Sequence, residues 1–321
     1  MRGICMRKAL VVGVNYYSDV NCLTGCVPDA YSVNAMLKQH ADGTKNFDVI
    51  LHAAIDEKTK ITRKMLKEYI EALFSDDSEI ALLYFSGHGY IEMVGGYIVT
   101  SECSSGDDGL PLNELLTIIN KSKAKNKIVI LDTCHSGQMG DISVDSNVVQ
   151  IAEGETILTA STKSQFSIDE GDGSTFTKLL VDALSGAAAN LLGDISPGSV
   201  YAHVDQSLGA WHQRPIFKTN VKNFVSLRKV QQPITLAELK KLTELFDESF
   251  EHKLDSSYEP EEPNPNSLNT EKFAILQKYN RVNLVVPVDA PHMYHAAMEA
   301  KSCKLTVLGE YYWGLVKKER I

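Results

Sequence analysis

Two short segments place a histidine and a cysteine in similar surroundings. Residues 84–89 (YFSGHG) contain His88, and residues 132–137 (DTCHSG), about 50 positions later, contain Cys134. A free thiol is only slightly ionised at neutral pH, so a thiol nucleophile needs an imidazole beside the sulfur and donors for the oxyanion that forms on the attacked carbonyl. The pair predicts nucleophilic catalysis, with Cys134 as the nucleophile and His88 as its base.

Each of these residues also has a structural alternative. His88 alone could be a hydrogen-bonded histidine at a strand end, and a lone cysteine is usually a small core residue. The paired glycine contexts favour the catalytic interpretation. His135 adjoins the cysteine, but neighbours on an extended turn point apart, so we assign it a structural role.

The elements that must position the pair are two buried strands. Apolar runs at 80–85 and 127–131 precede His88 and Cys134, so each residue stands at the carboxyl end of a strand, the edge at which open α/β sheets place their ligand sites. Strand patterns alternate with helical patterns along the chain. This alternation predicts an α/β fold with a mostly parallel sheet flanked by helices. The expected strands are 8–15, 47–55, 80–85, 127–131, 155–159 and 213–218, and the expected helices are 28–40, 61–74, 111–120, 174–184 and 199–208.

From about residue 7 to 225 the order of elements and the two motifs resemble a known family. The histidine-to-cysteine spacing is that of caspases, but residues 132–137 replace the caspase pentapeptide. The chain therefore resembles metacaspases and the related bacterial caspase-like, CHAT-related peptidases. The resemblance implies a caspase-like sandwich and a cysteine endopeptidase. It also implies an oxyanion hole made by the backbone amides of Gly89 and Cys134.

The resemblance extends to the pocket for the residue before the cleaved bond. Residues 25–30 (GCVPDA) are similar to a Gly-Cys-x-Asn-Asp-Ala stretch of metacaspases, with Pro28 in place of the Asn. This implies a pocket formed by Cys26, Asp29, Ser86 and Asp132. Two carboxylates suit Arg or Lys, because a cation in a cleft needs opposite charge. The alternative is that Asp29 caps a helix and Asp132 accepts bonds in a turn.

Calcium is implied by the same resemblance, through aspartates in loops near the site. The candidates are Asp107, Asp108 and Asp141, but residues 112–113 (LN) stand where the family has an Asp pair, and calcium requires six to eight oxygens. We therefore expect solvated loops and no required cofactor, with calcium as the alternative. The family also tends to cut itself after the nucleophile. Residues 135–162 contain no Lys or Arg, so activation of an intact chain is predicted, with Lys163 as the first candidate cleavage site.

Composition limits the class of protein. The chain has 321 residues, is 44% hydrophobic and carries a net charge of −9, which allows a sizeable core and argues against a nucleic-acid binder. It shows neither an apolar run of about 18 residues nor a signal segment at Met1. Its six cysteines form no CxxC pair. We expect a cytosolic protein with reduced thiols and no membrane partner.

Beyond the family resemblance the composition changes. We predict a caspase-like peptidase domain at 1–230, a helix (234–252) and an acidic, proline-containing linker within 231–271, and a small domain at 272–321. The aromatic stripe and basic end of the last part resemble a winged-helix unit, although such a stripe is more often core packing. We expect an adaptor for a regulatory partner, with nucleic-acid binding as a minor alternative.

The leading hypothesis is a cytosolic cysteine endopeptidase that cleaves after Arg or Lys. The resemblance implies a triggered effector of antiviral defence or cell death. One alternative is a catalytically silent caspase-fold scaffold for protein partners. Another is a caspase-like protease directed to Asp.

Overall fold

The computed structural model describes residues 6–92, 95–105, 107–133, 151–160, 173–209, 214–263 and 265–321. The chain divides into two compact units, the first formed by Met1–Asn190 with Asp194–Gln231 and the second by Leu191–Gly193 with Gln232–Ile321. Every helix among the described residues is too short or too polar to cross a membrane.

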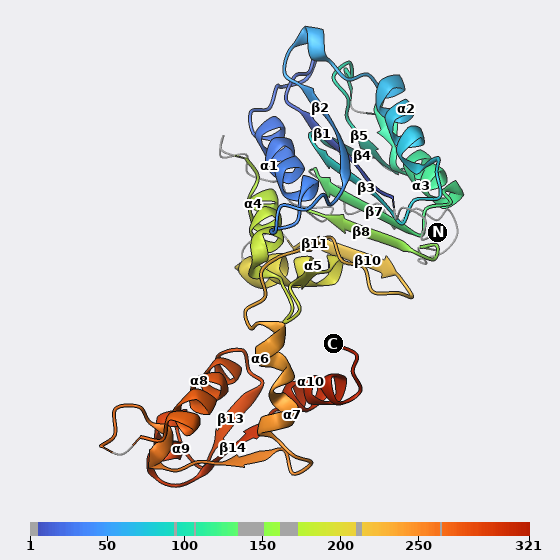
Figure 1. The fold of residues 1–321 in the computed structure, drawn as a ribbon. Helices are drawn as coiled ribbons and strands as arrows, with labels where there is room; N and C mark the ends of the chain where they lie inside the picture. The colour runs from blue at the N-terminus through green and yellow to red at the C-terminus, as the bar shows by residue number, and fades with distance from the viewer. Residues whose placement is uncertain are drawn as a thin grey trace. The chain divides into compact units, whose positions relative to one another are not determined.

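The first unit is built on a sheet of six strands in the order β10-β8-β7-β3-β1-β2 (Figure 1). Neighbouring strands are parallel except for β10, which runs antiparallel to β8. The predicted alternation of strands and helices is therefore found, with boundaries shifted by a few residues. The strands are β1 (Arg7–Val14), β2 (Asp48–Ala54), β3 (Ile80–Ser86), β7 (Asn126–Asp132), β8 (Glu155–Thr159) and β10 (Ile216–Asn220).

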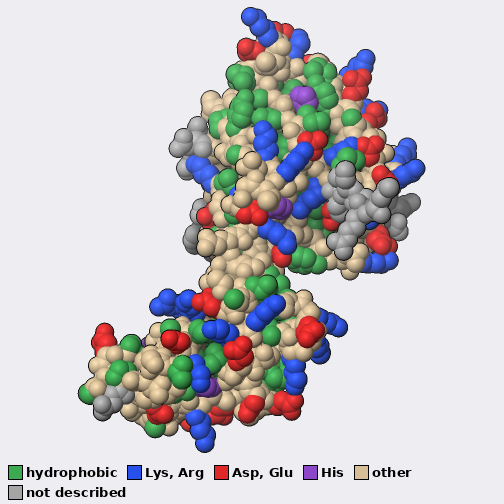
Figure 2. Space-filling model, viewed as in Figure 1, with side chains coloured by type: hydrophobic (Ala, Val, Ile, Leu, Met, Phe, Trp, Pro, Cys, Tyr) green, Lys and Arg blue, Asp and Glu red, His purple; other side chains and the backbone are tan. Residues whose placement is uncertain are grey.

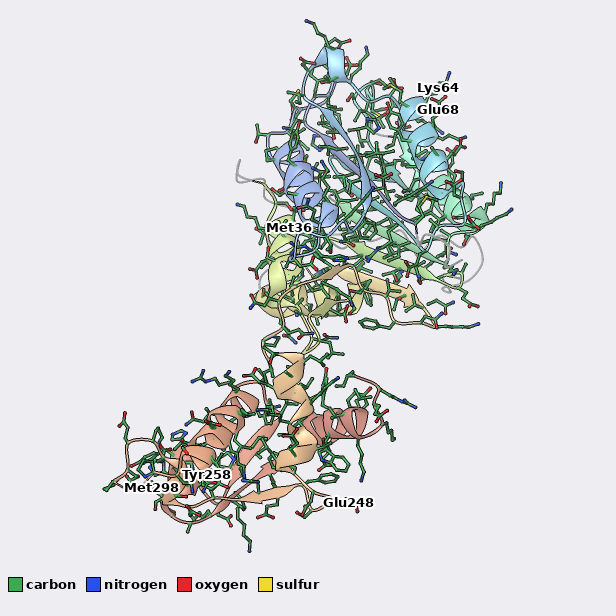
Figure 3. The ribbon with its side chains drawn as sticks, in the orientation of Figure 1. Met36, Lys64, Glu68, Glu248, Tyr258 and Met298 are labelled. Atoms are coloured by element: carbon green, nitrogen blue, oxygen red, sulfur yellow. The ribbon has the colours of Figure 1, made fainter. Side chains whose placement is uncertain are left out.

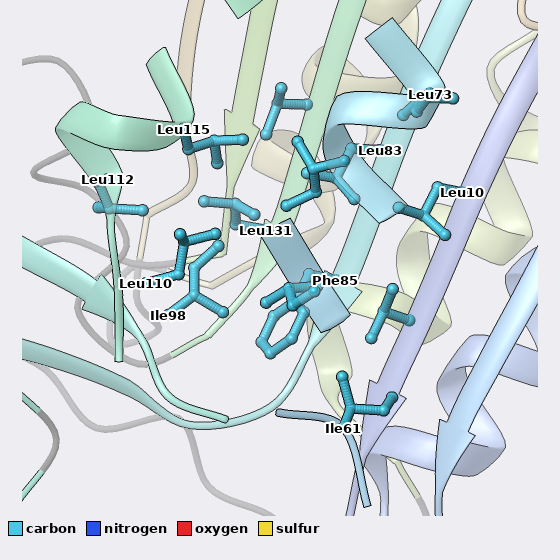
Figure 4. Close-up of a cluster of buried hydrophobic side chains, with 14 of the residues drawn as sticks. Leu10, Ile61, Leu73, Leu83, Phe85, Ile98, Leu110, Leu112, Leu115 and Leu131 are labelled. Carbon is cyan, nitrogen blue, oxygen red and sulfur yellow. The ribbon is translucent and has the colours of Figure 1, made fainter. Parts of the chain in front are cut away.

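Helices cover both faces of this sheet (Figure 1). Side chains of the central strands alternate between the faces, as a pleated strand requires. Leu10, Leu83 and Val129 are aligned across three strands and pack toward α2 and α3, whereas their sequence neighbours pack toward α1, α4 and α5. Figure 4 shows the first of these clusters, around Phe85 and Leu131. The helices are α1 (Cys26–Lys38), α2 (Arg63–Phe74), α3 (Leu112–Lys121), α4 (Thr175–Asp182) and α5 (Pro197–Ser207).

Helix α2 shows why these segments become helices that lie on a sheet. Thr62 accepts a hydrogen bond from the backbone of Met65, which caps the helix, and buried residues recur at helical spacing on one side. The opposite side carries charge: Lys64 and Glu68, labelled in Figure 3, lie one turn apart with 3.9 Å between Nζ and Oε1. Pairs of this kind contribute only tenths of a kcal/mol, roughly 0.3–0.5, so core contacts hold the helix in place.

Short strands complete the first unit. A small antiparallel sheet follows β3 and contains β4 (Gly89–Glu92), β5 (Gly95–Ile98) and β6 (Leu110–Pro111). A two-stranded ribbon joins β9 (Asp194–Ile195) to β11 (Arg228–Lys229).

The second unit has its own hydrophobic core and an antiparallel sheet in the order β12-β14-β13. Tyr258, labelled in Figure 3, belongs to this core. Helix α9 separates β13 from β14 in the sequence, and the winged-helix resemblance stays a prediction. The elements are α6 (Leu236–Lys240), α7 (Leu242–Leu245), β12 (Glu251–Lys253), α8 (Ser267–Arg281), β13 (Val285–Val288), α9 (Met293–Met298), β14 (Ser302–Leu305) and α10 (Val307–Lys317).

The segment 231–271 differs from the expectation of a helix followed by a linker. It contributes α6, α7, β12 and the start of α8 to the second unit, which is therefore larger than 272–321. The prediction of a helix through His252 is wrong beyond Leu245, because Glu251–Lys253 pairs with Ser302–Lys304 as a strand. That pairing partner lies far along the chain, so local periodicity does not reveal it.

Candidate functional site

The carboxyl ends of β3 and β7 lie side by side. Phe85 is the partner of Leu131, and Ser86 is the partner of Asp132, in a parallel register. Gly87 continues the pairing, since its backbone N–H donates to the carbonyl of Asp132 over 3.3 Å. His88 follows Ser86 by two residues, as Cys134 follows Asp132 in the sequence. Cys134 itself lies outside the described residues, as do His135 and Asp141.

The His88 ring is held by a backbone carbonyl. Its Nε2 lies 2.8 Å from the carbonyl oxygen of Asn21. Because a carbonyl only accepts, Nε2 must carry the hydrogen, and in the neutral ring Nδ1 is then the nitrogen with a free lone pair. The interaction therefore selects the tautomer in which Nδ1 can accept a proton.

Tyr17 holds the backbone and the ring of the same histidine. The His88 backbone N–H donates to the Tyr17 hydroxyl over 2.8 Å, and the two ring centroids are 4.7 Å apart. Tyr17 is only 2% exposed, and burial raises the pKa of its hydroxyl well above 10, with Cys26 adding to the effect. The hydroxyl therefore stays neutral. A Cβ at Gly87 would lie 2.7 Å from this oxygen, which explains the glycine before the histidine.

Tyr17 and Asn21 were not predicted from the sequence. Both lie in the loop between β1 and α1, which leaves the same carboxyl edge of the sheet as His88. Asn15 holds this loop from both sides, because its Oδ1 accepts from the backbone of Val27 and its Nδ2 donates to the carbonyl of Thr24, each over 3.0 Å. The available signal was the position of the loop after the first strand, since loops at this edge carry ligand sites.

Gly89 begins β4 and is paired with Ile98 of β5. His88 and Val99 stand opposite each other one position earlier in the same ladder. They form a hydrogen-bonded pair, because the Val99 N–H donates to the His88 carbonyl over 3.0 Å. In an antiparallel ladder, hydrogen-bonded and non-hydrogen-bonded pairs alternate. The N–H of Gly89 therefore points away from β5, on the edge side of β4.

The two predicted pocket carboxylates are both buried. Asp29 and Asp132 are each 5% exposed. The backbone N–H of Ser174 donates to Oδ2 of Asp29 over 3.0 Å, and the Ser174 hydroxyl donates to Oδ2 of Asp132. Thr177 also donates to Asp132, over 2.6 Å. The structure thus brings together two acidic side chains that are far apart in the sequence.

The other two predicted pocket residues lie beside them. Ser86 is 1% exposed and lies between Gly13 and Asp132 in the sheet register. Cys26 begins α1, about one turn before Asp29. Gly13 allows this helix to approach the sheet, because a Cβ there would meet the Cys26 carbonyl at 2.5 Å.

The calcium candidates among the described residues have local partners. Asp108 accepts from the backbone and hydroxyl of Ser104, and Asp107 accepts from Ser105, in the loop between β5 and β6. Within the described ranges, no group of three or more His, Cys, Asp or Glu side chains could hold a metal ion. The calcium requirement stays untested.

A family model of the caspase domain matches residues 6–242. The chain belongs to the caspase-domain family. Metacaspase-1 of Schizosaccharomyces pombe is 32% identical over 87 residues, which are 26% of this chain and 20% of that protein. Metacaspase-1 of Debaryomyces hansenii is 30% identical over 94 residues, or 28% and 21% of the two chains. This caspase-domain chain thus matches about a fifth of the length of these curated relatives.

Solved structures similar to this caspase-domain chain show the same fold. Protein GSU0716 from Geobacter sulfurreducens has a TM-score of 0.51 at 19% identity and covers 72% of this chain and 98% of its own. Caspase-1 from Spodoptera frugiperda has a TM-score of 0.52 at 16% identity and covers 71% and 92%. The predicted caspase-like α/β fold is confirmed.

Proposed function

We propose that this caspase-domain chain is a cysteine endopeptidase that cleaves peptide bonds after Arg or Lys. The Cys134 thiol gives its proton to Nδ1 of His88, and the sulfur attacks the scissile carbonyl as the thiolate. The imidazolium then protonates the leaving amine, and water hydrolyses the thioester and frees the thiol.

One observation carries this proposal. The pairing of Ser86 with Asp132 puts the segments that lead to His88 and Cys134 on neighbouring parallel strands that end at the same edge. The Asn21 carbonyl in addition selects the His88 tautomer that can accept a proton at Nδ1.

Oxyanion stabilisation is assigned to the backbone amides of Gly89 and Cys134. The ladder alternation turns the Gly89 N–H away from β5, which leaves it directed to the edge of β4. Loss of one such donor typically costs about 3 kcal/mol of transition-state stabilisation.

Selectivity is assigned to the pocket of Cys26, Asp29, Ser86 and Asp132. Two buried carboxylates side by side favour a cationic side chain, and they oppose an acidic one by repulsion. This supports Arg or Lys over Asp before the cleaved bond.

The test uses three fluorogenic peptides that differ only in Arg, Lys or Asp before the reporter. We expect the wild-type protein to release the reporter from the Arg and Lys peptides, and Cys134→Ala and His88→Ala to lose this activity. Cys303→Ala, which removes a thiol from the core of the second unit, serves as the control and should retain most of it. Equal signals from wild type and Cys134→Ala would support a silent scaffold, and preference for the Asp peptide would overturn the pocket assignment.

We also propose that the chain acts as a triggered effector in the cytosol, of the defence or cell-death type, and that its second unit binds a regulatory partner. The family resemblance supports the effector role, and the separate core of the second unit supports an appended module. Figure 2 shows Lys and Arg side chains interspersed with Asp and Glu over the visible face of this unit, which favours a protein partner over nucleic acid. Pull-down with the full chain, with and without nuclease treatment, distinguishes the two.

A further inference from the structure

Both carboxylates of the proposed pocket are bound by a single residue. Ser174 donates its backbone N–H to Asp29 and its hydroxyl to Asp132. The two donor atoms belong to one amino acid, so they lie only a few ångströms apart. The carboxylates that accept from them are therefore side by side.

Ser174 is itself fixed by the helix that follows it. It caps α4, because its Oγ accepts from the backbone N–H of Thr177 over 3.0 Å. The Thr177 hydroxyl uses its only proton toward Asp132, so the Tyr84 hydroxyl, 2.6 Å away, must donate to Thr177. Tyr84 is fully buried in β3, and burial raises the pKa of its hydroxyl, with the Asp132 charge adding to the effect. A series of hydrogen bonds thus runs from Tyr84 in the sheet core through Thr177 to Asp132, and both of its donors are neutral.

The residue before Ser174 is pressed against the other carboxylate. Gly173 has a φ of +92°, and a Cβ at this position would lie 2.3 Å from Oδ1 of Asp29. Only glycine allows this approach. The backbone of 173–174 and the amino end of α4 therefore hold Asp29, and the positive end of the helix dipole favours the two negative charges.

We propose that Ser174 is a positioning residue that holds Asp29 and Asp132 as one pair for a substrate guanidinium. This inference rests on the proposed function. Two adjacent carboxylates repel each other, and the donors of Ser174 and Thr177 offset that repulsion before substrate arrives. A guanidinium has five donors in a planar fork and can bind both carboxylates at once, whereas an ammonium is a point charge with three donors. A correctly held pair therefore prefers Arg to Lys.

The test compares Ser174→Ala with wild type on the Arg and Lys peptides. Hydrogen bonds to charged groups are worth about 1.5–3 kcal/mol, so we expect KM for the Arg peptide to rise roughly 10- to 100-fold. We expect kcat to change less than about threefold and the Arg-to-Lys ratio of kcat/KM to fall toward one. Ser174→Thr keeps the hydroxyl and should restore both values.

The matched control is Ser196→Ala. Ser196 caps α5 in the same way, with its Oγ accepting from the Ser199 N–H over 3.1 Å, but it binds neither carboxylate. Ser174→Gly is a second variant, because Gly is tolerated at a helix N-cap and keeps the backbone N–H for Asp29. If Ser196→Ala reproduces the change in KM, or if Ser174→Ala and Ser174→Gly both match wild type, Ser174 only caps its helix and the inference fails.

Asp132→Asn separates this inference from the function on which it rests. If Asp132→Asn abolishes cleavage of the Arg peptide while Ser174→Ala and Ser174→Gly keep wild-type KM, the pocket assignment stands and only the role of Ser174 is lost. If Asp132→Asn cleaves the Arg peptide as wild type does, the proposed specificity itself is wrong. Circular dichroism of each variant verifies that it is folded.

Discussion

His88 is fixed at three points before any substrate is present. Asn21 accepts from its Nε2, Tyr17 accepts from its backbone N–H, and the Tyr17 ring packs against the imidazole. None of these contacts requires a charged third residue. An imidazole oriented with Nδ1 as its acceptor nitrogen suits the proposed transfer of the thiol proton, and its position depends on the loop that follows β1.

Tyr17→Phe tests this dependence at the level of one oxygen. The variant keeps the ring but leaves the His88 N–H without its acceptor, which should lower the unfolding free energy by about 1–3 kcal/mol. Misplacement of the imidazole should lower kcat roughly 10- to 100-fold with a smaller change in KM. Steady-state kinetics on the Arg peptide and urea unfolding provide the two measurements.

Tyr69→Phe is the matched control for that variant. Tyr69 also stacks on a histidine, with 3.8 Å between its ring centroid and that of His52, but this pair lies between β2 and α2. Tyr69→Phe should therefore leave kcat unchanged. A wild-type kcat in Tyr17→Phe would show that the hydroxyl does not position the base.

The helices and strands that could be predicted from the sequence are those that a local residue pattern determines. The buried strands β3 and β7 are continuous apolar runs, and parallel strands end at the same edge of a sheet, so the proximity of Ser86 and Asp132 at that edge was predictable in outline. The roles of Tyr17, Asn21 and Ser174 were not. Each depends on a contact between loops or helix ends that share no local pattern, as does the strand at Glu251–Lys253.

Helix α1 shows how an element positions the site. It brings Cys26 and Asp29 to the proposed pocket only because Gly13 lets it approach β1. A Cβ at Gly13 would lie 2.5 Å from the Cys26 carbonyl and 2.8 Å from the Ala30 Cβ. Gly13→Ala should therefore lower the unfolding free energy by about 1–3 kcal/mol and displace α1. Because Asp29 moves with the helix, we expect KM for the Arg peptide to rise more than kcat falls.

Gly198→Ala is the control for overpacking. A Cβ at Gly198 would have the Ser196 Oγ as its nearest neighbour, at 3.9 Å, which is an ordinary van der Waals contact. This variant should keep wild-type stability and KM. Unaltered KM and stability in Gly13→Ala would mean that α1 approaches the sheet less closely than the structure shows.

The two units of the molecule have separate cores, and a partly buried histidine makes the stability of the second unit depend on pH. In the second unit, Nδ1 of His252 donates to the Leu245 carbonyl and Nε2 accepts from the Tyr258 hydroxyl, over 2.8 and 2.9 Å. Burial lowers the pKa of His252, and nearby Lys272 lowers it further. The unfolded chain takes up this proton near pH 6.5, before the folded chain does. The second unit therefore has the full stability contributed by neutral His252 above pH 6.5. It loses this stability as the pH falls toward the lowered pKa of His252 in the folded chain.

His252→Asn should remove this share of the pH dependence. Urea unfolding at pH 5 and 7.5, followed by Trp313 fluorescence in a Trp211→Phe background, reports on the second unit. We expect the midpoint to fall less between the two pH values in His252→Asn than in wild type, and His292→Asn, which changes an exposed histidine, to behave as wild type. An identical pH dependence in all three proteins would exclude His252 as the group responsible.

The proposed enzyme should work as an uncut chain. Residues 135–162 contain no Lys or Arg, so an enzyme with an acidic pocket has no preferred bond to cut between the nucleophile and Lys163. The carboxyl side of this segment is also anchored at β8 and β10. Asn220 Nδ2 donates to the Ile151 carbonyl over 2.9 Å, and the Gly154 N–H donates to the Asn220 carbonyl over 2.7 Å.

We therefore expect the wild-type protein to keep its intact mass during cleavage of the Arg peptide, with any slow cut at Lys163. Mass spectrometry over the course of the assay tests this, and Ser161→Arg, which places a basic residue just before that site, provides a sensitised variant in which a new product should appear. A product cut within 135–162 in wild type, absent from Cys134→Ala, would contradict the acidic pocket and the intact-chain mechanism together.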